Sequence, residues 1–151
     1  MANIIPDAFK LELLSGTHNF ASGGNTFKIA LYVTTLGPPY TTSSTVYSTT
    51  NEVSSSGTGY TTGGQALDGQ GVSVPGSNTA TVDFDNEVFS TVTLTSLGAA
   101  IYNTNASNKL CLVIDFGGDK VATSGDFTIQ FPAATAGAAI IRVAYYGISN
   151  K

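Results

Sequence analysis

Acidic side chains gather at one place in this chain, at Asp83, Asp85 and Glu87. In a strand, alternate residues share a face, so Asp83 and Asp85 would point the same way. Two carboxylates on one face can bind calcium or act as an acid–base pair. Acidic residues are also typical of a solvated strand end and turn, and no EF-hand spacing follows them. We interpret the cluster as a strand end, with calcium binding as the alternative.

The chain has one histidine, His18, and one cysteine, Cys111. A Ser-His-Asp triad needs its serine in a G-x-S-x-G context or a similar strained turn, and the sequence has none. His18 lies in a polar stretch after the one predicted helix, so we expect it on the surface. Cys111 lies in an apolar run, which is typical of a buried, unreactive thiol. Because Gly57 and Gly59 also lack the Lys-Ser/Thr of a nucleotide loop, we predict no enzymatic activity, no metal and no cofactor.

Composition excludes two classes of partner. Only 11% of the 151 residues are charged, against ~25% in an average domain, and 15 serines and 21 threonines supply most of the polarity. The net charge is −4 and the six Lys and Arg are dispersed, so nucleic acid is not an expected partner. The longest apolar run is far shorter than the ~20 residues of a membrane span. The chain does not begin with a basic and apolar leader, so we expect it to fold in the cytoplasm where it is made.

The N-terminal arm, residues 1–26, carries the one helix that we predict, over residues 6–14. A proline stands at its start and a glycine follows its end, as at many helix boundaries. Ile5, Phe9 and Leu13 are each four residues apart and form an apolar stripe. A helix this short is unstable alone in water, so the stripe must dock either on its own sheet or on a neighbouring subunit.

From Phe27 onward the apolar residues recur at every second position, which indicates β-strands. Ala80 and Val82, for example, should both face inward. We expect hairpin turns at Asp68-Gly69 and at Gly117-Gly118. Many short strands at close spacing favour a single mostly β domain over residues 1–151, an antiparallel β-sandwich of jelly-roll or immunoglobulin-like order. The predicted strands span residues 27–34, 79–84, 88–94, 99–102, 110–116, 126–131 and 139–145, with a broken strand pair over 65–74.

Residues 35–64 are rich in Pro, Ser, Thr and Gly, and we predict a long ordered loop there. Loops of this length inside a compact domain are usually functional or packed against a partner. Three tyrosines of this loop and two near the C-terminus are candidates for protein contacts, although such aromatic residues belong to cores equally often. With the apolar stripe of the helix, the candidate protein-contact residues are Ile5, Phe9, Leu13, Tyr40, Tyr47, Tyr60, Tyr145 and Tyr146.

Several short segments of the chain form a pattern by their order and spacing. They are Met1-Ala2-Asn3, residues 9–14, Asn51-Glu52-Val53, Gly57-Thr58-Gly59-Tyr60, Gly63-Gly64, residues 82–85, residues 98–103, residues 115–120 and residues 127–133. Together, more than any one of them alone, these segments resemble small structural proteins of tailed bacteriophages. Many members of that family have a tryptophan or a similar ring where this chain has Phe89, and Ser54-Ser55-Ser56 looks like a small insertion.

The resemblance implies a capsid cement or decoration protein on the outside of a phage head. Such proteins commonly form trimers and clamp adjacent major capsid subunits. The implied partners are therefore the major capsid protein and further copies of this chain as a homotrimer, in a virion assembled in the bacterial cytoplasm. The alternative is a tail, baseplate or fibre component whose loops and tyrosines bind a receptor or host polysaccharide. A polysaccharide-active enzyme would need two carboxylates facing each other across a cleft, which nothing in the sequence predicts.

Overall fold

The computed structural model describes residues 3–33, 39–76 and 78–145. Two antiparallel sheets and one short α-helix make up these residues, which confirms the predicted mostly β fold class. The elements in chain order are α1 (Asp7–Leu14), β1 (Phe27–Tyr32), β2 (Gln65–Ala66), β3 (Gly71–Gly76), β4 (Thr79–Asp83), β5 (Glu87–Asn103), the 3-10 turn η1 (Thr104–Ala106), β6 (Lys109–Ile129) and β7 (Ile141–Ala144).

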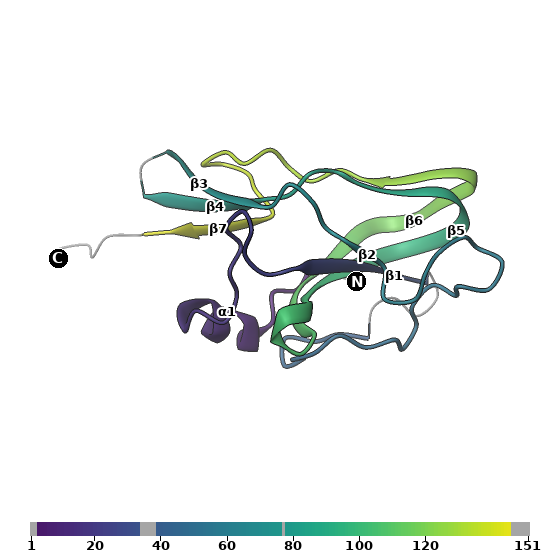
Figure 1. The fold of residues 1–151 in the computed structure, drawn as a ribbon, viewed down its shortest axis with the longest axis horizontal. Coiled ribbons are helices and arrows are strands. Elements are labelled where there is room, and N and C mark those ends of the chain that lie inside the picture. The colour runs from purple at the N-terminus through teal and green to yellow at the C-terminus, as the bar shows by residue number, and fades with distance from the viewer. Residues whose placement is uncertain (1–2, 34–38, 77, 146–151) are drawn as a thin grey trace.

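The two sheets lie face to face as a sandwich (Figure 1). One has the strand order β2-β1-β5-β6 and the other β3-β4-β7. In an immunoglobulin constant domain the fifth strand pairs with the second, whereas here β5 pairs with β1 and β6. A core of aromatic and aliphatic side chains fills the space between the sheets, with Phe20 stacked on Phe27 at 4.2 Å between ring centroids and Phe84 edge-on to both.

Two long strands, β5 and β6, replace four shorter ones that the sequence predicts. The expected segments 88–94 and 99–102 join in β5, and segments 110–116 and 126–131 join in β6. The expected turn at Gly117-Gly118 is therefore wrong. Gly98 pairs with Asp115 while Ser96 pairs with Lys120, so β6 has extra residues that form a bulge instead of a hairpin. Gly117 supports the bulge with a φ of +72°, which glycine adopts readily.

The predicted strand pair over residues 65–74 is also different in the structure. β2 pairs with β1 in the first sheet and β3 pairs with β4 in the second, so the chain crosses between sheets near Gly69 instead of folding back on itself. Within β4, Val82 is buried as expected, but Ala80 is exposed. This end of the β3–β4–β7 sheet extends past the core, so nothing in the described residues covers Ala80.

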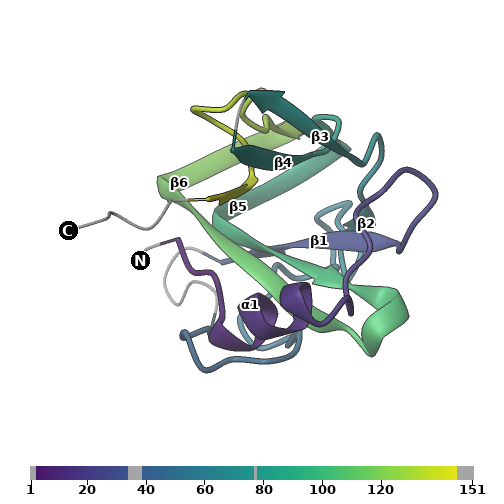
Figure 2. The same cartoon turned by 90° about the vertical axis from the view of Figure 1, so that its left-hand side faces the viewer.

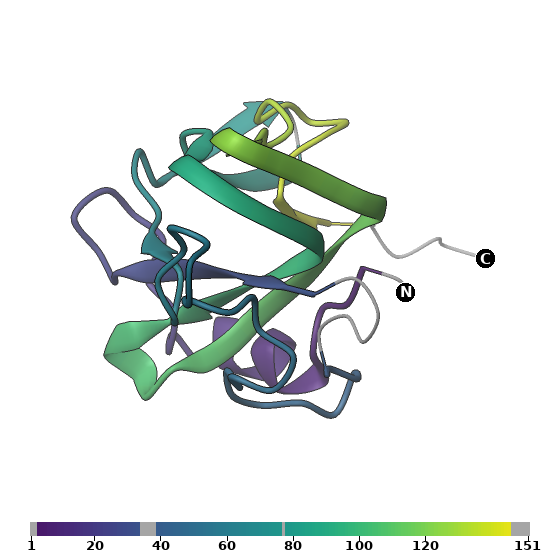
Figure 3. The ribbon, with the colours of Figure 1, turned by 90° about the vertical axis from the view of Figure 1, so that its right-hand side faces the viewer.

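β1 is buried on both faces, which its alternating pattern did not predict. Phe27, Ile29 and Leu31 face the sandwich core, while Ala30 and Tyr32 belong to a second cluster on the opposite face. Residues 39–64 cover that second face (Figure 3). They contain only isolated β-bridges and turns, and residues 35–38 of the predicted loop lie outside the described residues.

Helix α1 docks on its own domain (Figure 2). Phe9 is 1% exposed and packs against the rings of His18 and Phe20, with centroid distances of 5.0 and 6.1 Å. Leu13 is partly buried, while Ile5 is 45% exposed. Among the described residues, no helix has the length and apolar character to cross a membrane.

Gly64 should be the least replaceable glycine of the segment that leads into β2. Its φ is +67°, and an added Cβ would lie 1.8 Å from the carbonyl oxygen of Ile29 in β1. We predict that Gly64→Ala lowers the free energy of unfolding by about 3 kcal/mol or more. The control is Gly57→Ala, since Gly57 has a φ of +71° but no neighbour within 4 Å, and should lose only about 1–2 kcal/mol. Urea unfolding measures both, and equal losses would contradict the close approach.

Candidate functional site

The carboxylate of Glu52 is the centre of the residues that cover β1. Its Oε1 accepts hydrogen bonds from the Tyr60 hydroxyl and the Gly63 N–H, both at 2.6 Å. Its Oε2 accepts from the Tyr47 hydroxyl at 2.5 Å. Glu52 also forms an isolated bridge with Tyr32 of β1. One acidic side chain therefore ties three points of the irregular segment together and fixes them to the sheet.

Further tyrosines extend this cluster into the interior. The Tyr47 ring stacks on Tyr102 at a centroid distance of 4.2 Å, and the Tyr102 hydroxyl donates to the Gly63 carbonyl at 2.6 Å. The Tyr32 and Tyr40 hydroxyls lie 2.6 Å apart, and the Tyr32 hydroxyl also lies 2.7 Å from the Ser48 carbonyl. Burial, followed by the charges of Glu52 and Tyr40, raises the pKa of Tyr102 to about 12. These rings are structural side chains of the covering segment.

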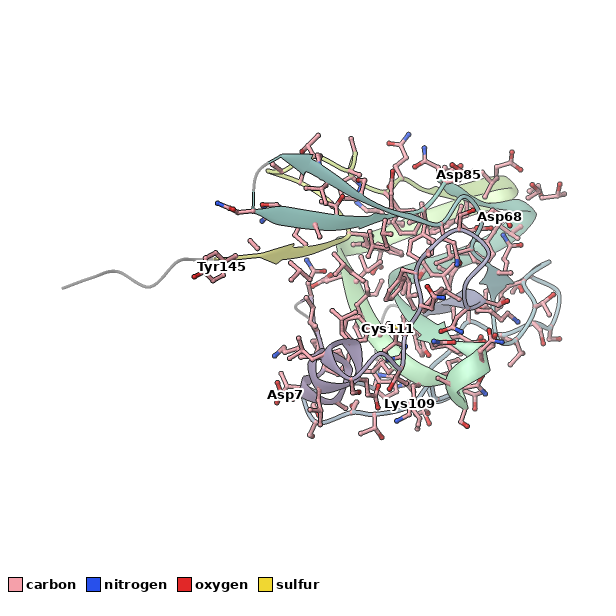
Figure 4. All side chains as sticks on the ribbon, turned by 60° about the vertical axis from the view of Figure 1, so that its left-hand side comes forward. Asp7, Asp68, Asp85, Lys109, Cys111 and Tyr145 are labelled. Carbon is pink, nitrogen blue, oxygen red and sulfur yellow. The ribbon has the colours of Figure 1, made fainter. Side chains whose placement is uncertain are left out.

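His18 is buried, contrary to the surface position that we expected. Its Nε2 lies 2.9 Å from Oε2 of Glu12, and its Nδ1 lies 3.0 Å from the side-chain amide nitrogen of Asn103. The amide nitrogen of Asn103 can only donate, so Nδ1 accepts and Nε2–H donates to Glu12. Lys109 also contacts Glu12, and Figure 4 shows it beside α1. Burial by itself raises the pKa of Glu12, but the hydrogen bonds and charges of Lys109 and His18 outweigh it and hold that pKa below its ordinary value.

Cys111 lies beside this histidine, with Sγ 3.8 Å from Nδ1 of His18. A thiol that contacts an imidazole, which in turn contacts a carboxylate, is the arrangement found in nucleophilic sites. Here the thiol is completely buried (Figure 4), and burial together with the charge of Glu12 raises its pKa well above the ordinary value. The thiolate that such chemistry needs is therefore disfavoured. The burial of Cys111 is as predicted, and the cluster connects α1 to the β5–β6 hairpin.

The acidic residues between the end of β4 and the start of β5 each have different neighbours. Asp83 accepts a hydrogen bond from the Phe84 N–H at 3.0 Å. Asp85 lies beside Gly69, near Asp68 (Figure 4). Glu87 is 9% exposed and accepts from the Gln65 side chain, and burial followed by the charge of Asp68 raises its pKa despite that hydrogen bond. No group of three or more potential metal ligands occurs in the described residues, so they offer no such set for the calcium alternative.

An open apolar groove follows the edge strand β6 and has a volume of about 620 Å³. Three aromatic side chains line it: Phe116 and Phe131 are partly buried and Phe127 is 7% exposed, while Asp119 and Lys120 add charge. A second hollow of about 400 Å³ continues it beside the N-terminal segment. The two hollows share Ile114, Pro132 and Ile140, and the second includes Ile5. We name this continuous feature the β6 groove.

The sequence-predicted contact residues are scattered across these features. Phe9, Tyr40 and Tyr60 are buried within the chain, Leu13 and Tyr47 are partly buried, and Ile5 and Tyr145 are exposed. Tyr146 lies outside the described residues. The sequence did not single out the aromatic side chains of the β6 groove, because a strand with alternating Phe residues has the pattern of a core strand. Phe127 does belong to the core, as that pattern predicts, whereas Phe116 and Phe131 are only partly buried beside the groove.

Comparisons of the chain with protein-family models, with curated protein sequences and with solved structures found no match. The residues of the chain, and the resemblance of its short segments, are therefore the basis on which a function can be proposed.

Replacing the Glu52 carboxylate tests its structural role. Glu52→Gln keeps the shape but places an amide nitrogen, which cannot accept, against one of its three donors. We predict a loss of about 1–3 kcal/mol in the free energy of unfolding, measured in urea at neutral pH. The matched control is Asp7→Asn, which removes a carboxylate charge at an exposed position and should change stability little. Equal effects of the two substitutions would contradict the central position of Glu52.

The buried tyrosines should make the protein sensitive to alkali. Burial raises the pKa values of Tyr32 and Tyr60 above the ordinary 10.0, so these groups stay neutral in the folded state while the unfolded chain ionises. Stability is then complete below about pH 10 and falls as pH rises towards the folded pKa values, by about 1.4 kcal/mol per pH unit for each such tyrosine. Urea unfolding between pH 7 and 11 measures this slope, and Tyr60→Phe should reduce it. A flat profile above pH 10 would refute the prediction.

Proposed function

We propose that this chain is a structural protein of a bacteriophage virion, a capsid cement or decoration protein. It binds the outside of the head and stabilises contacts between major capsid subunits. One observation carries the proposal: two of the segments behind the resemblance, residues 115–120 and 127–133, meet in the β6 groove. Residues 115–120 and 127–129 belong to the same strand, β6, and residues 130–132 follow it, so both segments line one surface feature.

The chemistry of the β6 groove suits a protein segment as its ligand. Its aromatic lining resembles the apolar centre of an interface, and Asp119, Lys120 and Asp126 resemble the polar rim. β6 is also an edge strand of its sheet. Ile4 and Val46 bridge its outer edge at Val113 and Lys109, so an added strand from a partner would pair with the part of β6 beyond Val113. We propose that a segment of the major capsid protein occupies the groove.

The physical demands on a cement protein agree with the rest of the chain. A shell under internal pressure gains stability from a subunit that buries area across its joints, and about 1,600 Å² is enough for specific binding. A surface with few charges and many hydroxyls permits close, partly hydrated contacts. We propose that the chain also associates with itself, as a homotrimer, because several linked contacts raise the overall affinity without new types of contact.

The alternative, a tail or fibre component that binds polysaccharide, needs aromatic rings exposed to the sugar. Tyr40, Tyr60 and Tyr102 are buried, which leaves Tyr145 as the one largely exposed tyrosine among the described residues. No catalytic activity is part of the proposal, since the one thiol and the one imidazole serve the interior.

The first test is the number of copies of this chain on purified phage particles, measured by quantitative mass spectrometry against the major capsid protein. A ratio near one to one supports a position on the shell. A handful of copies per particle would move the protein to the tail, and its absence from particles would refute a virion function.

The second test addresses the groove. Val121 lines it and is 66% exposed, so Val121→Asp should fold normally and weaken binding to undecorated heads at least tenfold. The control is Val46→Asp, the same change at a 50% exposed position in residues 39–64, which should bind as the wild type does. If Val46→Asp loses binding and Val121→Asp does not, the contact lies on the covering segment and the groove assignment is wrong.

A further inference from the structure

The β3–β4–β7 sheet has one apolar face that is only partly covered. A cleft of about 270 Å³ separates part of this face from residues 18–21 and the end of α1. None of its lining residues is Asp, Glu, Lys or Arg. The lining residues are Leu13, His18, Asn19, Phe20, Ala21, Val72, Ala80, Thr81, Val82, Ile141 and Val143.

Strand register shows that the open and the covered residues share one face. Val82 pairs with both Val72 and Ile141, and Ala80 pairs with Val143. Val82 and Ile141 are 7% and 5% exposed, whereas Val72 and Val143 are 57% and 51% exposed. The same apolar face is therefore closed next to the core and open towards the edges and the free end of the sheet.

Val74 and Tyr145 continue this open area, at 73% and 68% exposure. Val74 lies two residues beyond Val72, at the irregular register between Ser73 and Gly76, and Tyr145 is the first residue after β7, two beyond Val143. Tyr145 lies at the free end of the sheet, away from the body of the molecule (Figure 4). We name Val72, Val74, Ala80, Val143 and Tyr145 the open face.

The opposite face of the same sheet is covered by the chain itself. There the Ser73 and Thr81 hydroxyls lie 2.9 Å apart, and Thr81 is 2% exposed. The guanidinium of Arg142 donates to the Ala136 carbonyl at 2.9 Å, which holds the connection between β6 and β7 over the sheet. Of the two faces of this sheet, the open face is therefore the one that presents large apolar side chains without cover in the described residues.

We infer that copies of this chain contact one another through the open face and the edge of β7. A surface of apolar side chains without charged groups is complementary to itself, because no like charges meet when two identical patches approach. β7 is the last strand of its sheet, so its outer backbone edge can pair with the same strand of a second copy. Contiguous exposed apolar surface of this kind marks interaction sites on soluble proteins.

This isologous contact joins two copies, so it goes beyond the homotrimer included in the proposed function, and it does not depend on binding to heads. The experiment is sedimentation of the full chain over a range of concentrations, with circular dichroism and urea unfolding as checks of the fold. Wild type should assemble, and Val143→Asp should raise the dissociation constant at least tenfold. Val121→Asp, the same change in the β6 groove, should leave assembly intact. Val74→Asp replaces Val143→Asp if the latter does not fold.

The outcomes separate the possible occupants. A wild type that stays monomeric throughout would overturn the inference, and so would assembly unaffected by both open-face variants. If removal of residues 146–151 abolishes assembly while Val143→Asp does not, the tail forms the contact and the open face does not. If Val143→Asp weakens head binding with assembly unchanged, the open face belongs to the capsid contact. Loss of assembly in Val143→Asp supports the inference whatever the copy number on particles proves to be.

Discussion

The burial of β1 on both faces is the constraint on which the rest of the structure depends. A strand in the middle of a sandwich normally has one face on the core, and its other face is left to solvent or a ligand. Here the second face carries Ala30 and Tyr32, which require an apolar cover. The chain covers it with an irregular segment, whose backbone N–H and C=O groups find few hydrogen-bond partners within the segment itself. The Glu52 carboxylate and the tyrosine hydroxyls provide such hydrogen bonds. No buried side-chain nitrogen or oxygen in the described residues lacks a partner.

The sequence predicted the elements better than it predicted their connections. Helix α1, the start of β1 and the position of β7 follow from local patterns, namely a proline and a glycine at helix ends and apolar residues at every second position. The fusion of strands in β5 and β6 does not, because a Gly-Gly pair is compatible with both a hairpin and a bulge, and only the partner strand decides between them. The double burial of β1 was missed because Ala30 is small enough to pass for a solvent-facing residue.

The interior position of His18 could not be predicted either. Its partners are Glu12, Asn103 and Cys111, and two of these are more than 80 residues away in sequence. A polar residue is buried when its hydrogen bonds are satisfied, and this condition is visible only once distant segments are placed. The tyrosines illustrate the same limit. Three of the five tyrosines that we expected at a protein contact hold the covering segment instead, whereas the groove is lined by phenylalanines of a strand with a core-like pattern.

The pairing of β1 also has a consequence for how the protein is made. β1 pairs with β2 and with residues 98–103 of β5. Ile4, near the N-terminus, bridges Val113 in β6. A nascent chain that ends at β1 therefore lacks every strand with which its own residues will pair. About 80 further residues must leave the ribosome first, which takes about 4–16 s at bacterial and eukaryotic elongation rates. Throughout that interval the most apolar strand of the molecule is unpaired, and few charges in the chain oppose aggregation. The N-terminal third therefore cannot complete its native pairing until residues 98–113 have been made, because its contacts are far apart in the sequence.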